Sequence, residues 1–234
     1  MLFLMICFVT FSTAYGDTKK LSADIDKGWQ KLDIPLLEKT AAAFDEMAKK
    51  NPKDHLAPCY AAKAHFTIAD CLDIKSSEEF DQTGEGENHI DTALDKIKAS
   101  LAIKEDNVDT YILKFHVLRR KMAHVGFPKL MMYVAERQAA SDKANKLAPD
   151  NMQVQIMNAY QVAEGFPFPP PETVVAEFEK LLKKDPKLAL AYYEIGVAWD
   201  KASKPDDAKK NYQKALEVDP AQHWAKKKLG KLGK

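Results

Sequence analysis

The chain has 234 residues, and its 35 Lys and Arg against 34 Asp and Glu give a formal net charge of +1. This balance argues against a basic nucleic-acid-binding protein and against an acidic solvating tail. Hydrophobic residues at 46% and charged residues at 29% are typical of a folded chain. The 9 Gly and 12 Pro are too few for an all-β fold of this length, and three Cys cannot build a disulfide scaffold.

The first segment, residues 1–16 (MLFLMICFVTFSTAYG), carries no charged side chain and begins with a long apolar run. We expect a secretory signal peptide cleaved after Ala14 or Gly16, which is too short to span a bilayer as a mature helix. The segment lacks the usual Lys or Arg at its start, and a buried strand or an uncleaved anchor is the alternative. We expect an exported mature chain without a transmembrane segment, periplasmic in a bacterium in the first place and secreted in the second.

Two cysteines follow in one predicted helix, APCYAAKAHFTIADCL. Cys59 and Cys71 would stand ~18 Å apart along a continuous helix, beyond disulfide reach, and we expect two buried free thiols. His55 lies four residues before Cys59, and His65 lies further along the segment. A helix face offers at most two of these side chains to a metal, whereas a site needs three or four ligands. We therefore predict no metal site.

Helix-like segments that end at a proline recur along the chain. The endings fall at Pro52, Pro149, Pro186 and Pro220, and Glu105 takes the place of one proline. A proline ends a helix because its ring clashes with the preceding turn and it lacks an N–H. The recurrence predicts a repeat protein built from helices.

The last repeat, residues 189–222, is the most complete. Eight residues occupy positions 4, 7, 8, 11, 20, 24, 27 and 32 of a 34-residue unit: Tyr192, Ile195, Gly196, Trp199, Ala208, Tyr212, Ala215 and Pro220. Small residues at positions 8 and 20 let the two helices of the unit approach closely, and aromatic residues at positions 11 and 24 fill the space beside that contact. This pattern resembles the tetratricopeptide repeat (TPR) at every signature position.

The resemblance implies an all-α fold, a right-handed TPR-type solenoid of about five helix pairs with a C-terminal capping helix. It predicts one domain over residues 17–234. The boundaries of its parts are units 21–54, 55–107, 108–151, 152–188 and 189–222, and the cap 223–234. Phe115 and Arg137 depart from the small residues of positions 8 and 20 in the third unit, and the helix packing there is left open.

The spacing between helix ends predicts insertions at the turn between the two helices of units 2, 3 and 4. The extra residues lie in 73–90, 124–134 and 165–172. The alternatives are inserted loops or longer helices, the latter with a flexible tip at Gly84–Gly86. The run GFPFPPP (165–171) is expected to be loop because prolines interrupt helices. In a solenoid, equivalent turns stack on one edge.

The resemblance also implies that the first helix of each unit lines a concave groove. The partner-binding residues that it gives are Trp29, Lys63, Phe66, His116, Arg119, Arg120, Tyr160 and Tyr193. The basic members would meet a carboxylate or phosphate group, with Arg giving bidentate contacts. As the alternative, Arg119 and Arg120 are solvated or paired with nearby carboxylates.

No nucleotide-binding, hydrolase or metalloprotease motif occurs, and we predict neither an enzyme nor a cofactor. The predicted function is a non-enzymatic protein-interaction scaffold of the cell envelope, which binds a protein or peptide in the groove or on the inserted-loop edge. The alternative, similar to TPR partners of some periplasmic transporters, is an accessory component of solute transport that holds a small ligand. Aromatic residues in the insertions (Phe80, Phe127, Tyr133, Phe166 and Phe168) favour the alternative slightly.

Overall fold

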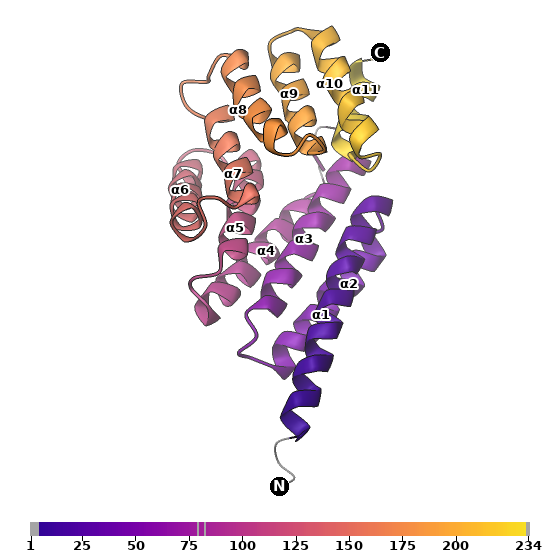
Figure 1. The fold of residues 1–234 in the computed structure, drawn as a ribbon, viewed down its shortest axis with the longest axis vertical. Helices are drawn as coiled ribbons and strands as arrows, with labels where there is room; N and C mark the ends of the chain where they lie inside the picture. The colour runs from indigo at the N-terminus through magenta and orange to yellow at the C-terminus, as the bar shows by residue number, and fades with distance from the viewer. Residues whose placement is uncertain (1–4, 79, 82, 233–234) are drawn as a thin grey trace. The chain divides into compact units, whose positions relative to one another are not determined.

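A computed structural model describes residues 5–78, 80–81 and 83–232, with side chains from residue 17 onward. These residues form eleven α-helices and one short 3-10 turn, and no strand occurs among them (Figure 1). The all-α prediction is confirmed. The chain divides into two compact units, Met1–Arg137 and Gln138–Lys234, and each is described by itself.

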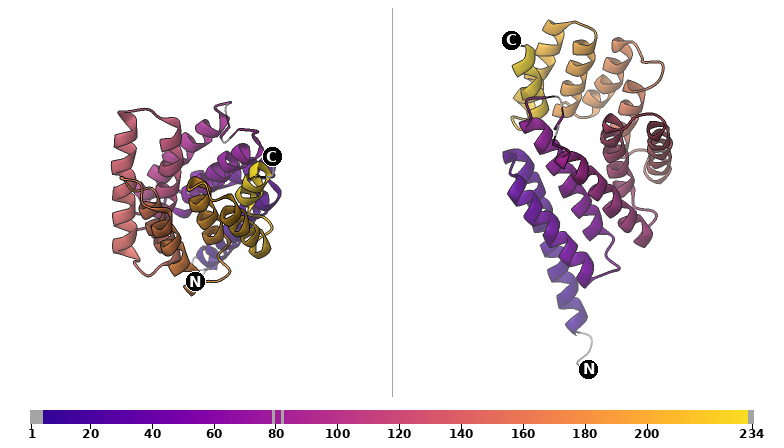
Figure 2. Two further views of the ribbon diagram at one scale, coloured as in Figure 1. Left: turned by 90° about the horizontal axis from the view of Figure 1, so that it is seen from above. Right: turned by 180° about the vertical axis from the view of Figure 1, so that it is seen from behind.

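The first unit contains the helices α1 to α5 and the beginning of α6. Their bounds are α1 Met5–Lys31, α2 Ile34–Lys50, α3 Leu56–Lys75, α4 Glu85–Ile103, α5 Val108–Lys121, the 3-10 turn η1 Met122–His124 and α6 Lys129–Leu147. Consecutive helices pack together, so that α3 lies against both α2 and α4 (Figure 2). Each pair therefore buries an apolar face that neither helix would cover alone.

The predicted signal peptide falls partly outside the described residues, which exclude residues 1–4. The backbone of residues 5–16 is part of α1. Among the described residues, no helix is both long and apolar enough to cross a bilayer.

The second unit contains the end of α6 and five further helices. These are α7 Met152–Ala163, α8 Pro171–Lys184, α9 Ala189–Lys201, α10 Pro205–Val218 and α11 His223–Leu232. Each packs on the next from α7 to α11. Ala225 of α11 is buried against the cluster around Tyr212, so α11 covers the last apolar face, as predicted for the cap.

The helices end where the prolines predict. Pro52, Pro186 and Pro220 each directly follow the C-cap residue of a helix. At the other end, the Asp33 carboxylate accepts a hydrogen bond from the Leu36 N–H at 3.0 Å, and this satisfies a free donor in the first turn of α2.

Close approach of paired helices depends on glycine at repeat position 8. A Cβ on Gly196 would lie 2.6 Å from two ring carbons of Tyr212, and a Cβ on Gly28 would lie 2.6 Å from Cγ of Leu37. In the third repeat, where the position is filled by Phe115, the Arg137 guanidinium lies 5.3 Å from the Phe115 ring centroid. This cation–π contact takes the place of the small residues.

The insertions are partly longer helices and partly loops. Residues 76–84 connect α3 to α4, residues 125–128 connect η1 to α6, and residues 164–170 connect α7 to α8. Two details of the sequence-based expectation were wrong. Gly86 is buried in the first turn of α4 and not at a loop tip, and Pro171 is the first residue of α8, where its missing N–H costs no hydrogen bond.

In the second unit, α6 and α7 meet through polar side chains. Asn145 and Asn158 exchange reciprocal amide hydrogen bonds of 2.9 and 2.8 Å, and the Ser141 hydroxyl donates to Gln161 Oε1 at 2.9 Å. Each amide thus finds both a donor and an acceptor across the interface, as half-buried amides require.

Cys59 and Cys71 are both free and buried, as predicted. Burial raises the pKa of the Cys71 thiol to about 12 and also raises that of Cys59, which accepts a hydrogen bond from the Thr110 hydroxyl at 3.3 Å. Both side chains are therefore neutral core residues at pH 7.

Candidate functional site

The groove residues predicted in α1 and α3 differ in how far they are buried. Trp29 and Phe66 are half-buried and pack on apolar clusters of the first unit. Lys63 keeps 44% of its side chain exposed, with Nζ 3.2 Å from the Asp26 carboxylate. Lys63 is the charged member of these three residues, and much of its side chain is exposed to solvent.

Two of the basic residues predicted on α5, Arg120 and His116, contact other side chains of the first unit, and Arg119 is half-buried. The Arg120 guanidinium forms an ion pair with the Asp73 carboxylate, which is fully buried, and only 11% of the Arg120 side chain is exposed. His116 is half-buried, with its ring at the edge of Phe115 at a centroid distance of 5.3 Å. For Arg120, the alternative of pairing with a nearby carboxylate is what the structure shows.

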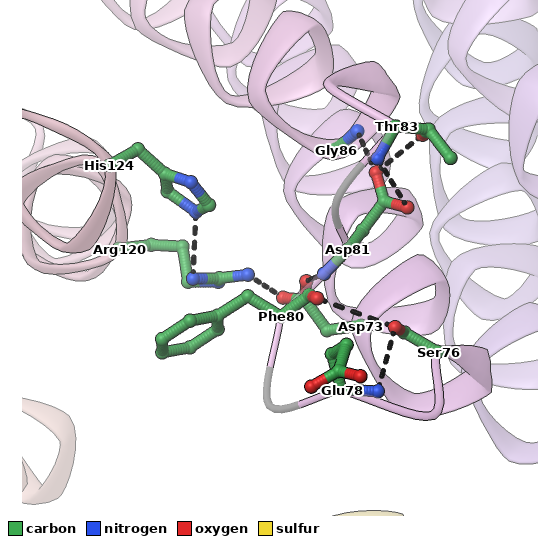
Figure 3. A network of polar contacts seen from close by, with 9 residues as sticks. All are labelled: Asp73, Ser76, Glu78, Phe80, Asp81, Thr83, Gly86, Arg120 and His124. Atoms are coloured by element: carbon green, nitrogen blue, oxygen red, sulfur yellow. Dashed lines mark hydrogen bonds and ion pairs between the residues drawn. The ribbon is translucent and has the colours of Figure 1, made fainter.

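Arg120 and Asp73 hold the connection between α3 and α4 in place (Figure 3). The second carboxylate oxygen of Asp73 accepts the Asp81 N–H at 2.7 Å, and the Arg120 guanidinium lies 4.3 Å from the Phe80 ring centroid. Nη1 of Arg120 lies 3.0 Å from Nε2 of His124. One buried arginine therefore joins α3, the connection and the end of α5.

Asp81 organises the start of α4 from the same connection. Its carboxylate accepts hydrogen bonds from the Thr83 hydroxyl at 2.7 Å and from the Gly86 N–H at 3.2 Å, and the Glu85 N–H donates to the Thr83 hydroxyl at 3.2 Å. Partial burial acts to raise the pKa of Asp81, but these hydrogen bonds outweigh it and lower the pKa.

Asp70 lies one helical turn before Asp73 on α3. The residue as a whole is partly exposed, but its carboxyl group is buried, and this burial raises the pKa to about 6 against the opposing charges of Arg120 and Arg119. Arg120 and Arg119 thus both lie close enough to the Asp70 carboxyl group to favour its charged form.

In the second unit, Tyr160 is a core residue with 4% of its surface exposed. Its hydroxyl donates to Glu194 Oε1 at 2.7 Å, and its ring stands edge-on to Phe178. Tyr193 is half-buried, with its ring centroid 5.8 Å from that of Tyr212. The six other groove residues belong to the first unit, and the continuous groove stays a prediction.

Large apolar side chains stand in solvent at two of the connections. We call residues 125–128 the first Phe-Pro loop and residues 164–170 the second, because each contains Gly-Phe-Pro. Phe127 in the first is 79% exposed, and Phe166 and Phe168 in the second are 93% and 81% exposed. Met131 and Met132, just after the first loop, are also exposed. The repeated Gly-Phe-Pro was the sequence signal for these two loops.

The packed helix pairs and the terminal cap define an all-α helical repeat protein. The tetratricopeptide repeat family model matches residues 189–222, which confirms the resemblance there. No curated protein matches the chain in sequence.

Solved structures with this fold include TTC0263, a thermophilic TPR protein from Thermus thermophilus. It is 13% identical, with a TM-score of 0.60 over 91% of this chain and 98% of that chain. The human IFIT1 dimer with m7Gppp-AAAA is 15% identical, with a TM-score of 0.60 over 90% of this chain and 45% of that chain. At these identities the likeness concerns the fold alone, a TPR-type array.

Proposed function

We propose that this chain is a non-enzymatic protein-interaction scaffold that docks a protein partner through its Phe-Pro loops. The observation that carries the proposal is the exposure of Phe166 and Phe168, whose ring centroids lie 6.4 Å apart. Burial of one such side chain contributes about 1.5–3 kcal/mol. Clustered apolar side chains in solvent mark interaction sites more often than scattered ones do.

The second Phe-Pro loop also has a backbone suited to binding. Pro167, Pro169 and Pro170 fix their own φ angles, and Pro170 has the extended values φ −55° and ψ 145°. A segment that is already stiff loses less conformational entropy when it docks. The partner that fits this loop is a protein with an apolar or aromatic groove of the kind that binds proline-rich segments.

The exposure of the same aromatic residues argues against the solute-transport alternative. A small-molecule pocket buries most of its ligand among apolar walls. Phe127, Phe166 and Phe168 are exposed and do not face such a cavity, and this exposure favours a protein partner over a solute.

We also propose that the chain is exported to the cell envelope by residues 1–16. The support is the uncharged apolar run followed by Ala14 and Gly16. Cell fractionation and amino-terminal sequencing of the native protein test this part. A mature protein that begins at Met1 in the cytoplasm would contradict it and would leave the docking proposal standing.

Crosslinking followed by co-purification from the native host tests the docking proposal. Loss of the main partner is expected for the double variant Phe166→Ser/Phe168→Ser. Val218→Ser, which removes an exposed apolar side chain from α10, serves as the matched control and should retain the partner. An unchanged set of partners in the double variant would refute the proposal.

A further inference from the structure

Three potential metal ligands converge between α2 and α4. Glu38 of α2 and Glu85 and His89 of α4 each offer one ligand atom, and these atoms all lie within 4.8 Å of one another. Both glutamates are exposed and His89 is half-buried. Short rotations of two exposed glutamates would bring the three atoms to the distances at which a single ion is bound.

The imidazole of His65, on α3, contacts the imidazole of His89. Nδ1 of His65, on α3, lies 2.8 Å from Nδ1 of His89, so one ring donates to the other. When Nδ1–H of His89 is the donor, its Nε2 presents a lone pair. Metal-binding histidines commonly donate their second N–H to a neighbouring acceptor, which fixes the ring orientation.

The carboxylates of Glu38 and Glu85 have no basic partner within the described part of the chain. Glu38 and Glu85 form no ion pair there with a Lys or Arg, although their ligand atoms are within 4.8 Å of each other.

The other charged groups near His65 are already paired. Asp45 and Lys96 act on His65 with opposite signs, and they form an ion pair with each other at 2.5 Å. Lys96 is therefore paired with Asp45 and not with either of the two glutamates. A divalent cation would supply the missing positive charge.

We propose that Glu38, Glu85 and His89 bind one divalent transition-metal ion, with Zn²⁺ the best match, and that His65 orients His89. Carboxylate and imidazole side chains both bind Zn²⁺, and three protein ligands leave a fourth position for water. The ion would join α2 to α4, which are separated by α3 in the sequence. The three proposed ligands are not members of the His55, Cys59, His65 and Cys71 set considered from the sequence, in which both thiols are buried and protonated.

Isothermal titration of the untagged, metal-free full chain with ZnCl₂ tests the proposal. One Zn²⁺ per chain is expected, and His89→Ala and the double variant Glu38→Gln/Glu85→Gln should each abolish that binding. His65→Gln should weaken binding by about 10–100-fold, the usual effect of losing a group that orients a ligand. Glu46→Gln, on α2 but paired with Lys49, is the matched control and should bind as the native chain does.

Two further readouts separate a site from a folding defect. Far-ultraviolet circular dichroism establishes that each variant is helical before titration. Added ZnCl₂ should raise the thermal unfolding temperature of the native chain and of Glu46→Gln, and leave that of His89→Ala unchanged, because an ion that binds only the folded state stabilises it. Absence of stoichiometric binding to the native chain, or equal binding by a folded His89→Ala variant, would overturn the proposal. Neither result bears on the Phe-Pro loops.

Discussion

The connection between α3 and α4 (residues 76–84) and the second Phe-Pro loop (residues 164–170) lie at the same place in their repeats and differ in chemistry. In the first, the Asp73 carboxylate accepts the Asp81 N–H and pairs with Arg120, and these contacts hold the connection against the helices. In the second, two Phe rings face solvent. An insertion at this turn can thus either stabilise the repeat or remain available to a partner.

The largest effect is expected for Arg120→Ala. This change leaves the fully buried carboxylate of Asp73 without its counter-charge, and loss of one member of a buried pair costs about 3–5 kcal/mol. Urea unfolding followed by circular dichroism measures the free energy of unfolding. Lys63→Ala removes the exposed pair with Asp26 and should cost no more than about 1 kcal/mol. Equal losses in both variants would show that the Arg120 pair is not effectively buried.

Asp70→Asn should stabilise the protein at neutral pH. The pKa of Asp70 is raised from 3.8 to about 6, so the folded state holds its proton more tightly than the unfolded state. The resulting penalty is absent below pH 3.8, grows as pH rises, and is complete above about pH 6. The gain from Asp70→Asn at pH 7.5 should exceed that at pH 3.5 by up to about 3 kcal/mol, since one pKa unit corresponds to about 1.4 kcal/mol. Unfolding curves at the two pH values measure the difference, and a gain independent of pH would contradict it.

Thr83→Ala should have a smaller effect. It removes the hydroxyl that donates to Asp81 and accepts from the Glu85 N–H, and a hydrogen bond of this kind contributes about 0.5–1.5 kcal/mol. Thr83→Ser keeps the hydroxyl and should retain most of the stability in the same urea experiment. If the two variants are equally destabilised, the lost methyl group and not the hydrogen bonds is responsible.

The smallest effect on folding is expected for Phe166→Ser/Phe168→Ser. Exposed side chains without buried contacts usually change the free energy of unfolding by no more than about 0.5 kcal/mol. Phe80→Ala in the other connection should cost more, because Phe80 is half-buried and contacts the Arg120 guanidinium. Thermal unfolding of both variants makes the comparison. A large loss from the double variant would mean that the Phe-Pro loop is part of the folded core.

The fold could be predicted because its determinants are local. Proline positions set the helix ends, and Gly28 and Gly196 mark the closest helix contacts, where a Cβ would overlap Leu37 or Tyr212. The insertions were harder to predict, since charged sequences such as those around residues 85–90 suit both a helix and an exposed loop.

The candidate sites depended on contacts that spacing does not encode. Arg120 was predicted to face a groove, but Asp73, on another helix, draws it inward. Glu38, His65, Glu85 and His89 come from three helices, and no motif relates their positions in the sequence. The Phe-Pro loops were visible as a repeated tripeptide, but their exposure depends on what surrounds them.

The paired amides of Asn145 and Asn158 have a consequence for how α6 and α7 align. Apolar side chains tolerate a small sliding of one helix along another, whereas two amides that bond reciprocally meet at one setting only. Displacing α7 by one helical turn, about 5.4 Å, would break both of these hydrogen bonds between the two amides. In a chain whose repeats have unequal lengths, this contact fixes the position of α7 along α6.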